Sequence, residues 1–185
     1  MTNDFGILSF GAYLPRLRLQ RKAIAAANTW FAPALRGLAK GERSMANWDE
    51  DAITMAVEAA RDCLAGRERS TVGQLILAST THPYDDRQNA GIVANALNLG
   101  SALAVLDVAG SQRAGTSALA TALASGNGKE ILVAAGEHRR AKAASPQEMH
   151  YGDGAAAFLV GIGKPVARLI AAHSETVDFV DHFRG

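Results

Sequence analysis

The chain has 185 residues, of which 48% are hydrophobic and 20% charged, a balance typical of a soluble globular protein with a sizeable core. Its formal net charge of +1 gives no long-range attraction to nucleic acid or to an anionic membrane, so we expect neither as a partner. The single cysteine, Cys63, excludes an intrachain disulfide framework and a cysteine-rich metal cluster. Neither a signal-peptide pattern nor an apolar run of roughly 18 residues is present, which leads us to expect a cytoplasmic protein.

Apolar, strand-like runs alternate with segments of helical periodicity along the chain. Strands are predicted over residues 5–13, 74–79, 102–108, 130–135, 155–160 and 166–172. The clearest helix is predicted over residues 49–66, and further helices over 89–97 and from 112 onward. This alternation indicates an α/β fold of the order βαβαβαββ, with a mostly parallel sheet that two consecutive strands close near the end.

The helix predicted from residue 112 has no polar face. After Arg113 it carries no charge as far as Gly126, and small side chains surround it. A helix of this kind is normally buried on all sides, whereas a single sheet covers only one. We therefore expect a second layer over its outer flank, supplied by a missing portion of the protein or by another subunit. The alternative is an ordinary small-residue helix that the chain's own helices cover.

The turn before this helix could carry several chemistries. Residues 110–117 satisfy most of the phosphate-loop pattern, but Thr116 stands at the required lysine position. Ser111 does not stand in the G-x-S-x-G frame of a nucleophile elbow. What remains is a strand-to-helix turn whose free N–H groups and partial positive charge suit a carbonyl oxygen or a thiolate.

Several long stretches resemble the thiolase superfamily, especially the branch that holds 3-hydroxy-3-methylglutaryl-CoA synthase and the third type of ketoacyl-carrier-protein synthase. LDVAGSQRAGTSAL is similar to the nucleophile turn of that family. The other similar stretches, in the family's order, are GILSFGAYLPRLRL, NWDEDAITMAVEAARDCL, LILASTTHPYDDRQNAGIVANALNL, ILVAAGEHRRAKAASPQEMHYGDGAAAFLVG and HSETVDFVDHFR. The resemblance implies that residues 1–185 are the N-terminal half of a thiolase-like domain, with the small-residue helix buried inside and the C-terminal half absent from this chain.

Two departures from the family pattern bear on catalysis. The resemblance places Gln112 where the family keeps its acyl-accepting cysteine, and a carboxamide cannot form a thioester. It places Thr80 where the synthase branch keeps its acid–base glutamate, and a threonine hydroxyl has no pKa near neutral pH, so it cannot replace the glutamate as an acid–base group on its own. The family's catalytic histidine and asparagine belong to the second half.

Gln112 has two interpretations of equal weight. In some polyketide loading ketosynthases a glutamine replaces the nucleophile, and this resemblance implies decarboxylation, with the amide stabilising an enolate as carbon dioxide leaves. The other interpretation is a helix-start residue in a subunit that has lost its chemistry. Ser111 is a third candidate for the catalytic role, because its hydroxyl could accept an acyl group beside a base, although such a serine is more often a helix cap.

Other polar residues are assigned to the site or to the surface. His82, Arg113 and Gly154 are predicted to bind substrate; for His82, which follows a strand end, pairing with Asp85 or Asp86 is the more frequent alternative. His138, Arg139 and Arg140 follow another predicted strand end. They could bind a phosphate of CoA, but their interpretation as a solvated basic turn is favoured. His150 is a weak candidate for proton transfer.

The remaining singled-out residues are assigned to structure. Trp48 is interpreted as a packing anchor and Cys63 as a small core residue. His173 and His182 are assigned to the surface or an interface. No set of residues has metal-ligand spacing, so no metal is expected.

The leading hypothesis is an acyltransferase-type condensing enzyme that handles acyl-CoA or an acyl carrier protein. It takes a CoA thioester as substrate and needs no cofactor. The resemblance implies a homo-oligomer, and some members of the branch also work with a zinc-ribbon and OB-fold partner. The alternative is a catalytically silent subunit or scaffold that binds acyl-CoA or a partner enzyme.

Overall fold

The computed structural model describes residues 4–126 and 128–177, and within them one mixed five-stranded sheet forms the centre of the molecule. The strand order is β1-β7-β6-β4-β5. The strands are β1 (Asp4–Tyr13), β4 (Val72–Ala78), β5 (Ala104–Val108), β6 (Glu130–Glu137) and β7 (Gly154–Gly163). β4 lies parallel to both β5 and β6, and β7 lies antiparallel to β6 and β1. The predicted α/β class is confirmed, and the sheet is mixed, with its parallel part formed by β5, β4 and β6.

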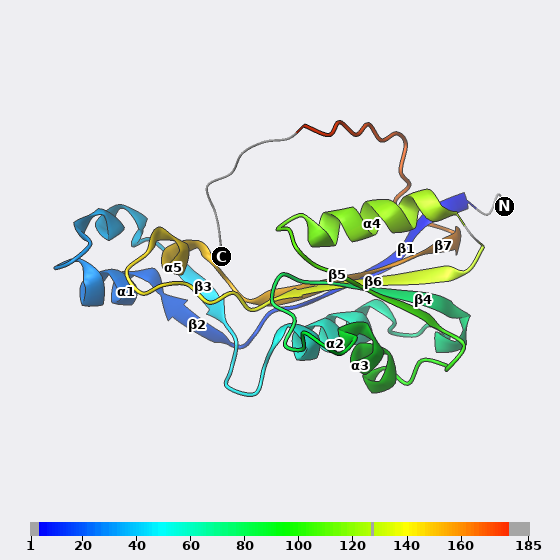
Figure 1. Cartoon of the computed structure of the whole chain (residues 1–185), viewed down its shortest axis with the longest axis horizontal. Helices are drawn as coiled ribbons and strands as arrows, with labels where there is room; N and C mark the ends of the chain where they lie inside the picture. Colours follow the sequence, from blue (N-terminus) through cyan, green and yellow to red (C-terminus); the bar gives the residue numbers. More distant parts are fainter. Residues whose placement is uncertain (1–3, 127, 178–185) are drawn as a thin grey trace.

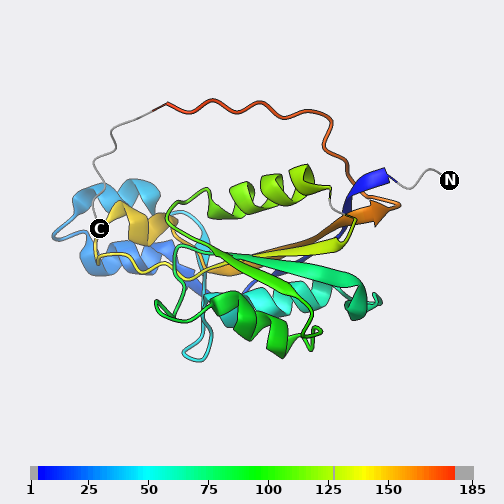
Figure 2. The ribbon, with the colours of Figure 1, turned by 45° about the vertical axis from the view of Figure 1, so that its right-hand side comes forward.

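Helices cover the two faces of the sheet unequally. α2 (Ala52–Cys63) and α3 (Asn89–Ala96) lie on one face, and α4 (Ala114–Ser125) lies alone on the other (Figures 1 and 2). Successive side chains of a strand point to opposite faces of the sheet, so each strand contributes to both layers. Leu75 of β4 packs in the hydrophobic cluster with α2 and α3, whereas Ile76 packs in the cluster with α4. None of the helices in the described part of the chain is long and apolar enough to span a membrane.

Helix α4 is covered on one side only. Ala114, Ala118 and Ala122 are buried against the strands, whereas Thr121 and Ala124 on the outer flank are exposed. The helix makes its main contacts with β6 and β4, and with the remaining strands of the sheet. The alternative in which the chain's own helices cover α4 is therefore wrong for the residues described.

α2 begins and ends as its sequence dictates. The Asp51 carboxylate accepts from the Thr54 backbone N–H at 2.8 Å, and the Thr54 hydroxyl oxygen accepts from the Asp51 N–H at 2.7 Å, which makes a capping box. The chain leaves the helix through Gly66, whose φ of +70° suits glycine. β1 approaches this helix so closely that a Cβ on Gly11 would lie 2.3 Å from the Cys63 nitrogen.

A small lobe beside the sheet is not predicted by the sequence (Figure 1). Its elements are β2 (Leu17–Gln20), α1 (Arg21–Asn28), the 3-10 helix η1 (Pro33–Leu38), β3 (Glu42–Met45) and α5 (Pro146–His150). Ile24, Leu35 and Met149 form its core. The apolar stretches here are short and interrupted, so they give neither period 2 nor period 3.6 over a useful window.

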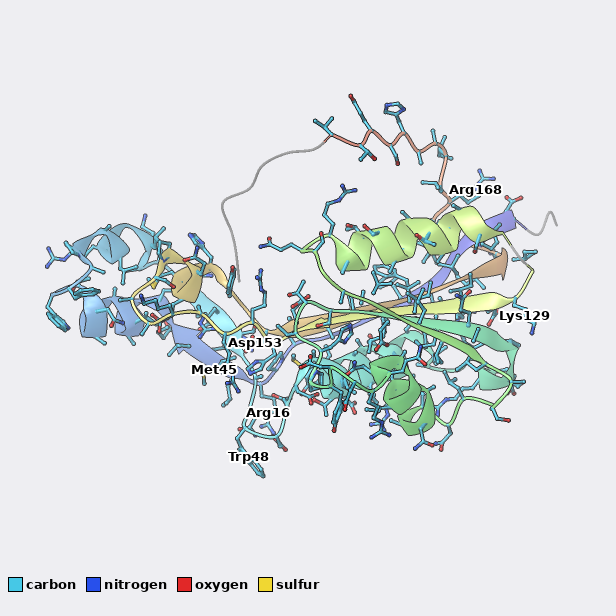
Figure 3. All side chains as sticks on the ribbon, viewed as in Figure 1. Arg16, Met45, Trp48, Lys129, Asp153 and Arg168 are labelled. Atoms are coloured by element: carbon cyan, nitrogen blue, oxygen red, sulfur yellow. The ribbon has the colours of Figure 1, made fainter. Side chains whose placement is uncertain are left out.

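Asp153 joins the lobe to the sheet (Figure 3). Its side chain is 3% exposed, and its Oδ2 accepts from the Ala46 backbone N–H at 2.8 Å. Its backbone carbonyl accepts from the Ser44 hydroxyl at 2.5 Å. His138 Nδ1 lies 3.2 Å from the same Oδ2. The aspartate of the G-D-G turn is thus a structural anchor, because it satisfies a buried N–H of the segment after β3.

The strand predicted over residues 166–172 is wrong. One isolated bridge joins Ile7 to Ala167, and the chain then leaves the sheet without regular structure (Figure 1). Ile170 is 85% exposed, so the apolar pattern that indicated a strand finds no core here. Of the two histidines that were assigned to the surface or an interface, His173 is exposed, and His182 lies outside the described residues.

Trp48 is not the packing anchor that its sequence neighbourhood indicated. Its side chain is 92% exposed at the tip of the loop before α2, where it points into solvent (Figure 3). The cap of α2 is made by Asp51 instead, so the helix start needs no aromatic contact. In contrast, Cys63 is 2% exposed in the α2 core cluster, which confirms it as a core residue.

The close approach at Gly11 predicts the cost of a side chain there. We expect Gly11→Ala to lower the free energy of unfolding by about 1–3 kcal/mol, because the added methyl overlaps the α2 backbone, which cannot yield like a flexible side chain. Chemical denaturation measures this. Gly91→Ala, on α3 where nothing lies within 4 Å of the added Cβ, is the matched control. Equal stabilities of the two variants would contradict the packing described.

The Asp153 anchor predicts a local effect on the lobe. We expect Asp153→Ala to cost roughly 2 kcal/mol of unfolding free energy, because it leaves the buried Ala46 N–H without an acceptor. Limited trypsin digestion should then cut faster after Arg16 and Arg18. Asp49→Ala removes an exposed carboxylate of the neighbouring loop and should change neither quantity. Unchanged digestion of the Asp153 variant would show that the lobe is held by other contacts.

Candidate active site

Three parallel strands end side by side at one edge of the sheet. Ala78 of β4 pairs with Val108 of β5 and with Ala135 of β6. Two residues beyond this level lie Thr80 on the β4 side and Glu137 on the β6 side, and Gln112 follows β5 in the turn that leads to α4. Open α/β sheets bind ligands outside the carboxyl ends of their strands, so this edge is the first place to look for a site.

A cavity of about 290 Å³ opens at this edge. Its lining residues come from three strand ends and from the α5 region: Thr80, Gln112, Glu137, Arg139, His150, Tyr151 and Gly152. Two of the three residues predicted to be catalytic, Gln112 and Thr80, are thus brought together. His150, which the sequence marks only weakly, joins them.

Glu137 is the residue that sequence reasoning missed. It is the one carboxylate among the residues that line the cavity. Its Oε1 accepts from the Thr80 backbone N–H at 2.7 Å, and its Oε2 accepts from the Thr80 hydroxyl at 2.8 Å. The Thr81 hydroxyl donates to the same Oε2 at 3.3 Å. The signal in the sequence is the position of Glu137 at the end of a predicted strand, directly before the basic residues 138–140.

The turn that carries Gln112 is shaped by its neighbours. Gly110 has a φ of +86°, and the Ser111 hydroxyl oxygen accepts from the Arg113 backbone N–H at 3.0 Å. α4 then begins at Ala114, two residues later than predicted. Ser111 therefore serves the turn before the helix, and it is not among the residues that line the cavity. Gln112 is exposed and faces the cavity at the helix mouth.

Cationic and donor groups line the same cavity as the carboxylate. The Arg139 guanidinium lies 4.6 Å from the centroid of the Tyr151 ring, a cation–π contact that holds it at the cavity wall. The Gln112 amide and the His150 ring can both donate hydrogen bonds. The cavity thus combines one carboxylate with several groups able to stabilise a negative charge.

His82 lies in a neighbouring cavity of about 290 Å³, which shares Thr80 with the first. Both ring nitrogens are buried and have no hydrogen-bond partner among the described residues. The expected pairing with Asp85 or Asp86 is therefore absent from this part of the chain. A structural role would normally give such buried nitrogens a hydrogen-bond partner, so His82 stays a predicted substrate-binding residue.

The other predicted substrate-binding residues do not reach either cavity wall. Arg113 is exposed at the start of α4, where its carbonyl accepts from the Ser117 N–H at 2.8 Å. Gly154 begins β7, and a Cβ there would lie 3.2 Å from the Tyr13 carbonyl oxygen of β1. Gly154 thus serves close strand packing.

The chain's thiol is not part of the site. Burial raises the pKa of the Cys63 thiol, and its Sγ lies 3.6 Å from the Ser9 hydroxyl oxygen. A buried thiol with a raised pKa is a poor nucleophile. Among residues 4–126 and 128–177, no group of three or more His, Cys, Asp and Glu side chains is arranged to hold a metal ion.

Comparison with known proteins gives consistent results. No protein-family model matches the chain. The hydroxymethylglutaryl-CoA synthase of Archaeoglobus fulgidus is 33% identical over 187 residues, which covers 97% of this chain and 54% of the relative. The chain thus spans about half the length of the curated relatives that it matches over nearly all of its own length.

Solved structures match the fold. MvaS in complex with 3-hydroxy-3-methylglutaryl coenzyme A superposes with a TM-score of 0.76 at 25% identity, covering 87% of this chain and 40% of that one. The priming β-ketosynthase of the R1128 polyketide pathway shares the fold, with a TM-score of 0.74 at 22% identity, covering 89% and 52% of the two chains. The resemblance seen in the motifs is thereby confirmed: along nearly its whole length the chain is similar to hydroxymethylglutaryl-CoA synthases, and it has the thiolase-like fold of that branch.

Proposed function

We propose that the protein containing this chain handles acyl-CoA, or an acyl carrier protein, in condensing-enzyme-like chemistry that proceeds without a cysteine nucleophile. The observation that carries the proposal is the shared cavity of Gln112 and Thr80. These are the positions at which the resemblance implies a cysteine and a glutamate. The homologous MvaS structure holds 3-hydroxy-3-methylglutaryl coenzyme A, which supports a CoA thioester as the substrate class.

We further propose that the chain is the N-terminal half of a larger thiolase-like protein. The curated relatives are nearly twice as long, and the outer flank of α4 has no cover from the described residues. A second half, or another subunit, laid over this flank would bury it. A homo-oligomer and a zinc-ribbon or OB-fold partner stay predictions from the resemblance.

The reaction that Gln112 supports best is decarboxylation of a malonyl-type thioester. The bond between the α-carbon and the carboxylate breaks, its electron pair moves onto the thioester as an enolate, and carbon dioxide leaves. The Gln112 amide lies at a helix N-terminus, where an N–H donor can stabilise the enolate oxygen. A proton delivered to the α-carbon then completes the product.

A silent subunit is the second candidate function. Its support is the position of the chain's single thiol, which is buried in the α2 core, so no cysteine of this chain can accept an acyl group at the cavity. Such a subunit would bind acyl-CoA, or a partner enzyme, without turnover.

Decarboxylation separates the two candidates. We expect the natural protein to release carbon dioxide from malonyl-CoA, and Gln112→Ala to lower the rate about 10²-fold, the usual loss when one donor to a developing oxyanion is removed. Gln147→Ala, on α5 and outside the cavity wall, is the control. A wild-type protein that binds malonyl-CoA and releases nothing would favour the silent subunit. Unchanged release by the Gln112 variant would remove the catalytic role of that amide.

Restoring a nucleophile tests where the reacting carbon lies. We expect Gln112→Cys to gain one acetyl group from acetyl-CoA, because its thiolate would lie at the helix N-terminus beside the thioester. Intact-protein mass spectrometry detects the adduct. Gln147→Cys is the control thiol, and the double variant Gln112→Cys with Thr80→Glu restores both positions. Equal labelling of the control, or no adduct in either variant at position 112, would contradict the placement.

A further inference from the structure

We propose that Glu137 and Thr80 form a proton relay, in which Glu137 is the general base of the cavity and acts through the Thr80 hydroxyl. The inference rests on the proposed function, since the reacting group is taken to be the α-carbon of an acyl thioester. It concerns a residue to which the sequence motifs assign no role.

The geometry holds the two side chains in one arrangement. Thr80 is tied to Glu137 at two points, through its backbone N–H at 2.7 Å and its hydroxyl at 2.8 Å. The strands behind them are fixed by the parallel pairing of Ala78 with Ala135. Contacts to both carboxylate oxygens fix the plane of the Glu137 carboxylate, so its orientation toward the Thr80 hydroxyl is set before any ligand binds.

The direction of the Thr80 hydroxyl proton decides whether this group donates a hydrogen bond to a ligand or accepts one from it. A threonine hydroxyl has one proton to donate and lone pairs to accept with. The Thr80 proton is donated to Glu137, so the Thr80 oxygen offers an acceptor to whatever occupies the cavity. The Gln112 amide and Arg139 line the same cavity and can donate. The cavity thus combines a proton acceptor with hydrogen-bond donors that can stabilise the negative charge left on the substrate when the proton departs.

The relay moves two protons and leaves one electron pair on the substrate. The C–H bond at the α-carbon breaks, and its proton passes to the Thr80 oxygen while the hydroxyl proton of Thr80 passes to Oε2 of Glu137. The electron pair of the C–H bond stays on the substrate as an enolate, and the products are this enolate, a neutral Glu137 carboxyl group and an unchanged Thr80. An enolate formed by loss of carbon dioxide is the same species, and the relay run in reverse from protonated Glu137 returns a proton to its α-carbon.

The relay also gives a reason for the threonine at position 80. The resemblance implies a glutamate there, and the structure places a glutamate carboxylate from the neighbouring strand on the Thr80 hydroxyl. A carboxylate from β6 thus lies within hydrogen-bond distance of the position at which the resemblance implies one, and the Thr80 hydroxyl links it to the cavity.

Exchange of the α-protons tests the relay without requiring condensation or decarboxylation. The natural protein is mixed with acetyl-CoA in D₂O, and loss of the acetyl methyl signal is followed by proton NMR. We expect Glu137→Gln and Thr80→Val each to lower the exchange rate about 100-fold or more, which is the usual effect of losing a general base. Thr80→Ser keeps the hydroxyl and should retain exchange. Calorimetric titration with acetyl-CoA and thermal unfolding accompany every variant.

The same two strands provide a matched control. Thr71, next to the start of β4, donates its hydroxyl to Glu130 at the start of β6, so a second threonine–glutamate pair lies at the opposite end of the sheet. Glu130→Gln should leave the exchange rate unchanged. A loss equal to that of Glu137→Gln would show that any such pair acts through folding, and would overturn the relay.

The outcomes separate this inference from the proposed function. A wild-type protein that binds neither acetyl-CoA nor an acetylated carrier protein overturns both. Binding without exchange overturns the relay and leaves the silent subunit standing. Exchange that survives Glu137→Gln overturns the relay and leaves an acyl-CoA enzyme. Loss of exchange in Glu137→Gln but not in Thr80→Val overturns the role of Thr80, since Glu137 would then act directly.

Discussion

The parallel pairing of β4 with β5 and β6 is the constraint on which the rest of the structure depends. It brings the ends of three strands to one level, so residues that are far apart in the sequence share one cavity. Thr80, Gln112 and Glu137 arrive from different strands, and a hydrogen-bonded ladder fixes their spacing. The burial that stabilises this ladder lies behind the site, where Leu75, Leu132 and Leu159 are fully buried against α2 and α3. The site is thus placed by packing in which its own residues take no part.

Much of the sheet could be predicted because its periodicity is strong. The strand at residues 74–79 and the helix at 49–66 carry long apolar patterns and a recognisable start signal, and both are confirmed with shifts of a few residues. The lobe of α1, η1 and α5 could not be predicted, because its core is assembled from short segments of low periodicity that meet only in three dimensions. The false strand at 166–172 has the opposite cause, since an apolar pattern was present but no sheet edge pairs with it beyond one bridge.

The sequence motifs mark single residues of the candidate site, but they do not mark the contacts that form between strands. Gln112 and Thr80 were found because motifs mark their positions, and the structure brings them to one cavity. Glu137 was missed because no motif marks it, and its meaning appears only once β6 lies beside β4. Arg113 and Gly154, which were predicted to bind substrate, do not line the cavity. Both stand next to marked residues, but the helix start and the β1–β7 contact use them instead.

The central claim is that an acyl thioester binds at the carboxyl edge of β4, β5 and β6, with its carbonyl at Gln112 and its α-carbon at Thr80. A crystal structure of the natural protein with a stable, non-hydrolysable analogue of acetyl-CoA tests this most directly. We expect the carbonyl oxygen to lie within hydrogen-bond distance of the Gln112 amide and the α-carbon to lie beside the Thr80 hydroxyl, which still donates to Glu137. An acyl group bound elsewhere, or a Thr80 hydroxyl turned away from Glu137 in the complex, would contradict it.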